Sequence, residues 1–356
     1  MHSRVNNFDF VRLMAALMVL SGHQYALMFL LEPRPFGLVT MGTLGVLVFF
    51  VLSGYLVAQS WRRDPHPWRF AVRRFLRIWP GLGVVVVLTT FVVGPVFTEE
   101  SLGAYFQDAQ TWKYLEQLGL IQQPDLPGVF HGNVWSVVNG SLWTIPLEVR
   151  WYAILMVAGA CGLLSARLRV PLLTVVVAYA FYMFVVFDVQ RNPAAAYPKP
   201  GFGCEYGCFF CYGVVLFHWQ SAWARRPLLL AACLGAMASV AAVLNYSYLA
   251  LYLVLPFVVI WFGNRSTPWL SRAGRYGDLS YGIYIYAYLV QQSIIAVIGF
   301  RHGYALTLLI SLLATLACAY ASWHLVEKPA LGLKHHLTAA GSADVTEGTS
   351  VSSATP

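Results

Sequence analysis

The sequence predicts an all-α, polytopic membrane protein of about ten transmembrane helices with both termini in the cytoplasm. The chain has 356 residues, of which 58% are hydrophobic and only 11% are charged. Because soluble domains carry about 25% charged residues, this composition disfavours a soluble enzyme, a disordered protein and a nucleic-acid-binding protein. The net charge of +8 therefore needs another explanation, which the placement of Lys and Arg along the chain provides.

Apolar runs long enough to cross a bilayer recur along the chain. A bilayer core requires about 20 mostly apolar residues per helix. Ten such runs begin near Phe8, Leu38, Ile78, Ile145, Val170, Phe202, Leu228, Tyr246, Leu279 and Ala305. A short polar notch around Asn245 separates the seventh run from the eighth, which predicts a tight helical hairpin. We expect residues 1–336 to form one membrane domain and residues 337–356, which are rich in Ser, Thr, Ala and Gly, to form a disordered cytoplasmic tail.

The basic residues predict the orientation. Most of the 23 Lys and Arg residues fall in alternate connections, whereas the opposite connections hold Arg34, Lys113, Arg191, Lys199 and Arg301. Because Lys and Arg collect in cytoplasmic loops, this bias places both termini in the cytoplasm and implies an even number of helices in the plasma (inner) membrane.

The first predicted helix carries three ionisable residues, Asp9, Arg12 and His23. Such residues are costly inside a membrane and often functional. Arg12 and His23 are eleven positions apart, which puts them on one helix face and about 16 Å apart along the axis. Alone, Arg12 is explained as a snorkelling anchor and His23 as a helix–helix hydrogen bond. Together they suggest a path from a cytoplasmic anion site to a proton-transfer site.

A second dense segment, SLWTIPLEVRWY, covers residues 141–152. Pro146 suits the first turn of a helix, so Glu148 is expected near the outer end of the fourth helix, at a depth comparable with His23. A carboxylate beside a His fixes its tautomer and raises its basicity, as a general base requires. The alternatives are a local pair with Arg150 or a favourable charge at the helix N-terminus. The same segment supplies the candidate substrate-binding residues Ser141, Trp143 and Arg150.

The third constellation is a basic run at the cytoplasmic start of the third helix. Arg73 and Arg77 are spaced i,i+4, and Arg74 and Arg77 are spaced i,i+3, so their guanidinium groups share a face. Guanidinium groups bind phosphate in a bidentate manner, which makes this face a candidate phosphate clamp. The alternative is a role in topology and contact with anionic lipid. We predict no metal site, because packing explains the clustered cysteines.

These segments together resemble the membrane-bound acyltransferase-3 family. The opening Asn7-Phe8-Asp9 to Arg12, followed by His23, is typical of that family. Further matching strings follow in order across residues 6–331: FFVLSGYLV (49–57), RRFLRIWP (73–80), SLWTIPLEVRWY (141–152), SYGIYIYA (280–287) and VEKP (326–329). The ninth helix of the family often reads Tyr-Leu-Trp-His, whereas this chain has Ala287 at the last of these positions, so no role for a His there is carried over.

The resemblance implies transfer of an acyl group, usually acetyl from acetyl-CoA, to a hydroxyl of a saccharide or glycolipid. Implied acceptors are an exopolysaccharide or lipopolysaccharide unit, a Nod-factor-type oligosaccharide or a macrolide. It implicates Arg12 with His23 and Arg74 with Arg77, and it matches Glu148 to an acid of the fourth-helix motif.

We therefore predict that His23, oriented by Glu148, is the general base. The residues predicted to hold the acyl-CoA co-substrate are Arg12, Arg73, Arg74 and Arg77. Expected partners are the acceptor and the lipid bilayer, without nucleic acid or metal. The competing class is a proton-coupled transporter, which would use the buried ions as a relay but needs no basic clamp.

Overall fold

The computed structural model describes residues 6–165, 168–181, 203–299 and 302–334. Within these ranges every regular element is helical, and a single bridge between Thr98 and Val129 is the only strand-like pairing. The predicted all-α class is confirmed. The tail predicted for residues 337–356 lies outside the described residues.

Each of the ten apolar runs contains a helix. They are α1 (Phe8–Leu27), α2 (Met41–Arg63), α3 (Pro67–Leu88), α7 (Thr144–Ala160), α8 (Arg169–Phe181), α9 (Cys204–His218), α11 (Pro227–Val243), α12 (Ser247–Gly263), α13 (Ser280–Ile298) and α14 (Gly303–Ser322). Shorter helices are α4 (Gly94–Phe97), α5 (Leu102–Gln107), α6 (Ala109–Lys113), α10 (Gln220–Trp223) and α15 (Lys328–Gly332). Irregular turns join several of them: Pro35–Gly37, Tyr114–Gly119 and Leu270–Tyr276 are 3-10 helices, and Thr89–Val93 and Trp323–Glu327 are π-helical.

Five helical stretches in the described ranges are long and apolar enough to cross a membrane. They are Phe8–Leu27, Met41–Arg63, Pro67–Phe97, Ser280–Ile298 and Gly303–Gly332. The helices α11 and α12 are apolar but shorter, with 17 residues each. The chain is therefore built as a membrane protein.

The third helix begins earlier than expected. Its apolar run begins near Ile78, but α3 begins at Pro67, so the helix includes the whole basic run and the helical spacing expected for its arginines is present. Pro67 occupies the first helical turn, where proline is favoured, and the side chain of His66 accepts from the backbone N–H of Arg69. Phe70 and Leu76 are buried on the same helix, so its apolar face stabilises the basic turns. The arginines of this run are consequently fixed in position.

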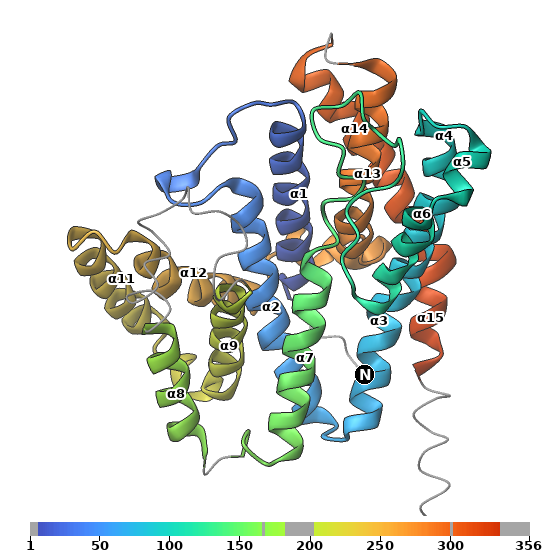
Figure 1. Ribbon diagram of the computed structural model, residues 1–356. Coiled ribbons are helices and arrows are strands. Elements are labelled where there is room, and N and C mark those ends of the chain that lie inside the picture. Colours follow the sequence, from blue (N-terminus) through green and yellow to red (C-terminus); the bar gives the residue numbers. More distant parts are fainter. Residues whose placement is uncertain (1–5, 166–167, 182–202, 300–301, 335–356) are drawn as a thin grey trace, which may run out of the picture.

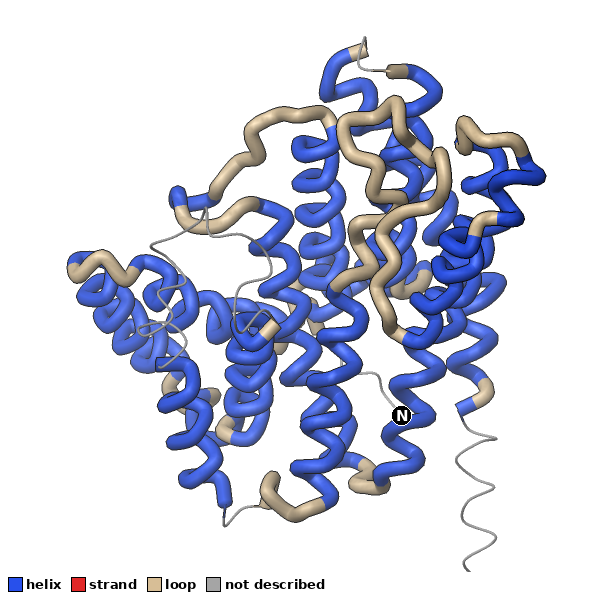
Figure 2. Tube along the Cα trace, viewed as in Figure 1, coloured by secondary structure: helices blue, strands red, loops and turns tan. Residues whose placement is uncertain are grey.

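The helix α1 lies in the middle of the bundle, packed against α2 and α13 (Figure 1). The helices α8, α9, α11 and α12 gather beside α2, while α3 and α15 lie on the opposite side. The long loop from Leu120 to Trp143 runs over the upper part of α13 (tan in Figure 2). Gln292 of α13 anchors it, since its side chain donates to the carbonyls of Trp135 (2.6 Å) and Val137 (2.7 Å).

Two glycines let α2 and α9 approach closely. A Cβ on Gly54 would collide with the carbonyl oxygen of Phe210, and a Cβ on Gly213 would collide with that of Val51. Small residues at such crossings allow backbone contact between membrane helices. The position of α2, which carries one wall of the site described below, depends on this contact.

We predict that Gly54→Ala lowers the melting temperature of the purified protein, because the added methyl group pushes α2 from α9 at a cost of about 1–3 kcal/mol. Thermal unfolding in detergent measures the change. Gly235→Ala is the control: its Cβ would meet no atom within 4 Å, and Ala favours a helix over Gly. An equal loss in both variants would contradict the account.

Candidate active site

A cavity of about 120 Å³ lies among α1, α2, α3, α7 and α13. Its wall carries three cations, Arg12, Arg74 and Arg77, and the acid Glu148. Apolar and hydroxyl-bearing side chains complete the lining, among them Phe49, Ser53, Leu56, Thr144, Tyr152 and Tyr284. The structure thus brings together four of the residues singled out from the sequence.

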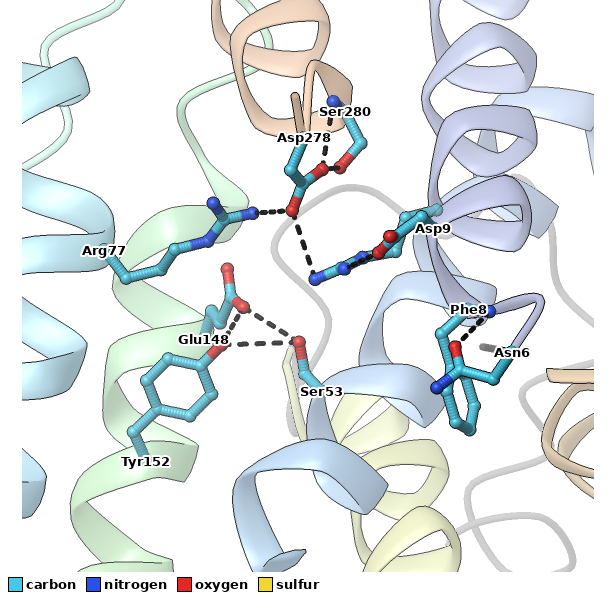
Figure 3. A network of polar contacts seen from close by, with 10 residues as sticks. Asn6, Phe8, Asp9, Ser53, Arg77, Glu148, Tyr152, Asp278 and Ser280 are labelled. Carbon is cyan, nitrogen blue, oxygen red and sulfur yellow. Dashed lines mark hydrogen bonds and ion pairs between the residues drawn. The ribbon is translucent and has the colours of Figure 1, made fainter. Parts of the chain in front are cut away.

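One carboxylate, that of Asp278, joins two of these cations. Its Oδ2 lies 2.6 Å from Nη2 of Arg77 and 3.2 Å from Nη1 of Arg12 (Figure 3). Its Oδ1 accepts hydrogen bonds from the hydroxyl (2.5 Å) and backbone N–H (3.3 Å) of Ser280. Burial opposes ionisation, but Arg12 and Arg77 outweigh it and hold the pKa of Asp278 well below its usual range. Asp9 adds a second ion pair to Arg12.

Arg74 differs from its neighbours, because the described residues place no acid within ion-pair distance of it. Its guanidinium lies 5.8 Å from the ring centroids of both Phe70 and Tyr152. Its Nε is buried without a hydrogen-bond partner among these residues. A fixed, incompletely paired cation on a cavity wall is suited to an anionic ligand.

The carboxylate of Glu148 accepts hydrogen bonds from two hydroxyl groups, one on α2 and one on its own helix. It accepts a hydrogen bond from Ser53 of α2 at 2.9 Å and another from Tyr152, one turn along α7. In Figure 3, Glu148 lies between Arg77 and this Ser53–Tyr152 pair. Glu148 therefore belongs to the same polar cluster as the arginines.

His23 lies apart from the cavity. Its ring packs edge-to-face on Tyr288 of α13, with centroids 5.1 Å apart, and its Nδ1 is buried without a hydrogen-bond partner in the described chain. Arg12 and His23 are separated by about 16 Å along α1. The described residues contain no hydrogen bond between His23 and Glu148, whose carboxylate is used by Ser53 and Tyr152. The expectation that Glu148 orients His23 does not fit this geometry.

The remaining candidates lie around the site rather than in it. Arg73 forms an ion pair with Asp64, which Arg69 also contacts at 3.0 Å, so the charge of Arg73 is already neutralised.

The three candidate substrate-binding residues have different surroundings. Ser141 is fully buried, and its Oγ has no hydrogen-bond partner among the described residues. Trp143 packs on Tyr206, with ring centroids 5.3 Å apart. Arg150 is exposed and absent from the cavity lining, and the ion pairs of the described chain do not include the local Glu148–Arg150 pair.

Three polar residues of the cluster, Ser53, Tyr152 and Asp278, were not predicted to be functional. Ser53 and Tyr152 lie in two of the motif strings, FFVLSGYLV (49–57) and SLWTIPLEVRWY (141–152), but neither was given a role. Asp278 follows Arg265, Arg272 and Arg275 in a basic connection. An isolated acid in such a connection was the available signal for a buried ion pair. No three His, Cys, Asp or Glu side chains gather as metal ligands would in the part of the chain that is described.

Comparison with known proteins gives three findings. An acyltransferase-domain family matches residues 5–324. The chain is 32% identical over 334 residues to a protein named O-acetyl transferase from Shigella phage Sf6, covering 91% of this chain and 95% of the relative. It is 26% identical over 361 residues to Nodulation protein 10 of Rhizobium leguminosarum bv. viciae, covering 94% and 95% respectively. No solved structure matches.

We predict that Asp278→Asn destabilises the protein by about 3 kcal/mol at neutral pH, because it leaves two guanidinium groups without their shared carboxylate. Since folding lowers the pKa of Asp278, this stabilisation is present above the unfolded value and is lost as the pH falls below about 4. Melting temperatures of both proteins between pH 7 and pH 3 measure it.

Asp64→Asn is the control, because the Asp64 side chain is 29% exposed against 15% for Asp278. Its effect should be smaller, since solvent screens an exposed ion pair. A gap between wild type and Asp278→Asn that widens as the pH falls would contradict the assignment.

Proposed function

Because this chain belongs to the acyltransferase-domain family, we propose that it is an O-acetyltransferase of the plasma (inner) membrane. It transfers an acetyl group from cytoplasmic acetyl-CoA to a hydroxyl of a saccharide or glycolipid acceptor. We also propose that the chain crosses the membrane ten times with both termini in the cytoplasm, so that the basic connections lie on the cytoplasmic side, where acetyl-CoA is found. One observation carries it: Arg74, without an acidic partner in the described chain, lines a cavity beside the helix that bears His23.

The cations support binding of the donor. Coenzyme A is a polyanion, and Arg74, which has no acidic partner in the described chain, offers it a guanidinium group on a cavity wall. Arg12 and Arg77 add positive charge to the same wall, although both are paired with Asp278. Arg73 is not required for this role, because Asp64 already neutralises it. The axial separation of about 16 Å between Arg12 and His23 suits a long, extended pantetheine arm that carries the thioester from the basic cluster toward the imidazole.

His23 performs the proton transfer in this proposal. Its unpartnered Nδ1 accepts the proton of the acceptor hydroxyl, and the oxygen forms a bond to the thioester carbonyl carbon. The carbon–sulfur bond then breaks, and the imidazolium returns the proton to the thiolate, which leaves as free CoA. Tyr288 holds the ring. Glu148 acts as a positioning residue for the donor, through the cluster with Ser53 and Tyr152.

A saccharide acceptor is supported by the resemblance drawn from the sequence motifs. The buried Ser141 hydroxyl lies in the segment that leads into α7. Its neighbour Gly140 packs on the ring of Tyr288, the residue that also contacts His23. Ser141 is therefore our candidate for contact with the acceptor, whereas the exposed Arg150 is less suited to it.

We predict that His23→Gln lowers acetyl transfer by about 10²–10⁴-fold, the usual contribution of a general base, without loss of folded protein. Mass spectrometry of envelope and secreted glycans with and without the gene identifies the acceptor by a lost acetyl increment. The same measurement with the variant tests His23. Full acetylation by a normally inserted His23→Gln protein would overturn this mechanism.

We predict that Arg74→Gln raises the KM for acetyl-CoA by at least about tenfold, since a charge-assisted bond to phosphate is worth roughly 1.5–3 kcal/mol. Steady-state kinetics in membranes measures it. Arg69→Gln, on the same helix but paired with Asp64 outside the cavity, should leave the KM within about twofold. Equal effects of the two substitutions would indicate a general charge effect instead.

A further inference from the structure

A second and larger cavity, of about 590 Å³, lies where α2 and α12 end and α1 begins. Sites for small molecules usually measure about 300–1,000 Å³, so this one has room for a substantial ligand. The side chains used in the argument are Leu56, Gln59, Arg63, Trp261, Asn264 and Arg265. Of these side chains, Leu56 also lines the first cavity, and the other five do not.

The second cavity is cationic. Arg63 and Arg265 line it, and within the described ranges neither forms an ion pair with an acid. Both residues are exposed. Two guanidinium groups without acidic partners favour a ligand that carries phosphate groups.

The same cavity presents aromatic and amide groups. The guanidinium of Arg265 lies 5.1 Å from the ring centroid of Trp261, which in turn lies parallel to Phe257 at 6.5 Å. Indole and guanidinium planes are both surfaces on which nucleobases stack. Asn264 is held rigidly, because its Oδ1 accepts from Tyr55 (3.0 Å) and Gln220 (3.2 Å). Phosphate-binding cations beside a stacking surface are typical of a nucleotide site.

One face of α2 connects the two cavities. Ser53 lines the first cavity, Leu56 lines both, and Gln59 and Arg63 line the second. These spacings of three and four residues keep the four side chains on neighbouring turns of one helix face. Ser53 and Arg63 are separated by about 15 Å along the axis, a separation that an elongated ligand can bridge.

We infer that the second cavity binds the adenosine 3′-phosphate 5′-diphosphate end of the acyl-CoA donor, and that the pantetheine arm passes Leu56 into the first cavity. This inference rests on the proposed function and adds a nucleotide subsite to it. Arg63 and Arg265 bind the phosphate groups, Trp261 stacks with the adenine, and the Gln59 amide faces the same space. Arg74 of the first cavity then contacts the phosphate to which the pantetheine arm is bonded, as its proposed role in donor binding requires.

The test compares two acetyl donors. The double variant Arg63→Gln/Arg265→Gln should raise the KM for acetyl-CoA by at least about tenfold, because charge-assisted bonds to phosphate are lost. It should leave the KM for S-acetylpantetheine, which lacks the nucleotide, within about twofold. The control Arg62→Gln/Arg272→Gln removes two exposed cations that do not line either cavity, and it should change neither KM. An equal rise for both donors, or no rise for acetyl-CoA, would overturn the inference.

A binding measurement separates this inference from the proposed function. Calorimetry with adenosine 3′,5′-bisphosphate needs no turnover, and it should show saturable binding to the wild type that the double variant loses. Failure of the wild type to bind the bisphosphate overturns the nucleotide subsite. Failure to transfer acetyl from either donor, with binding intact, overturns the proposed function alone.

The headgroup of an anionic lipid would offer the second cavity the same phosphate chemistry as the nucleotide. Repeating the calorimetry in nanodiscs of phosphatidylcholine, with and without phosphatidylglycerol, distinguishes the two. Affinity for the bisphosphate that is unchanged by the anionic lipid supports the nucleotide subsite. Competitive loss of binding in phosphatidylglycerol would assign the cavity to a lipid headgroup and overturn the inference.

Discussion

The ion pairs of Asp278 hold the site together. One carboxylate at the start of α13 contacts Arg12 of α1 and Arg77 of α3, so three elements far apart in sequence meet at one charge. Burying charges in a membrane is costly, and pairing reduces that cost. Without the carboxylate, the two guanidinium groups would repel each other at the wall of the cavity. The relative position of these helices, and hence the shape of the site, depends on this contact.

The acids also decide which cations remain for a ligand. Asp64 forms ion pairs with Arg69 and Arg73, and Asp278 forms ion pairs with Arg12 and Arg77. Arg74, Arg63 and Arg265 have no such partner within the described residues. The basic run therefore divides into structural arginines and available ones, although its sequence alone presents them as equivalent. This division supports a path in which a polyanionic donor meets available cations first and a buried imidazole further along α1.

The sequence predicted the helices well, because runs of apolar residues and the terminal signals of helices are local properties. All ten runs contain helices, and α3 begins before its apolar run, since its basic turns also carry the buried Phe70 and Leu76. Which side chains contact one another was harder to predict from the sequence. Spacing placed Arg12 and His23 on one face, but it did not show that Glu148 bonds Ser53 and Tyr152 instead of His23. Contacts between distant segments, such as Arg77 with Asp278, depend on tertiary packing that periodicity does not encode.

The central claim is that an acyl-CoA lies along α2 and α1, from the available cations to His23. A cryo-electron microscopy structure of the protein in nanodiscs with bound CoA tests it most directly. The account predicts density for the pantetheine arm in the cavity lined by Arg74 and Glu148, with its thiol directed toward His23 and the nucleotide at Arg63 and Arg265. Density for CoA at any other surface, with this cavity unchanged, would contradict it.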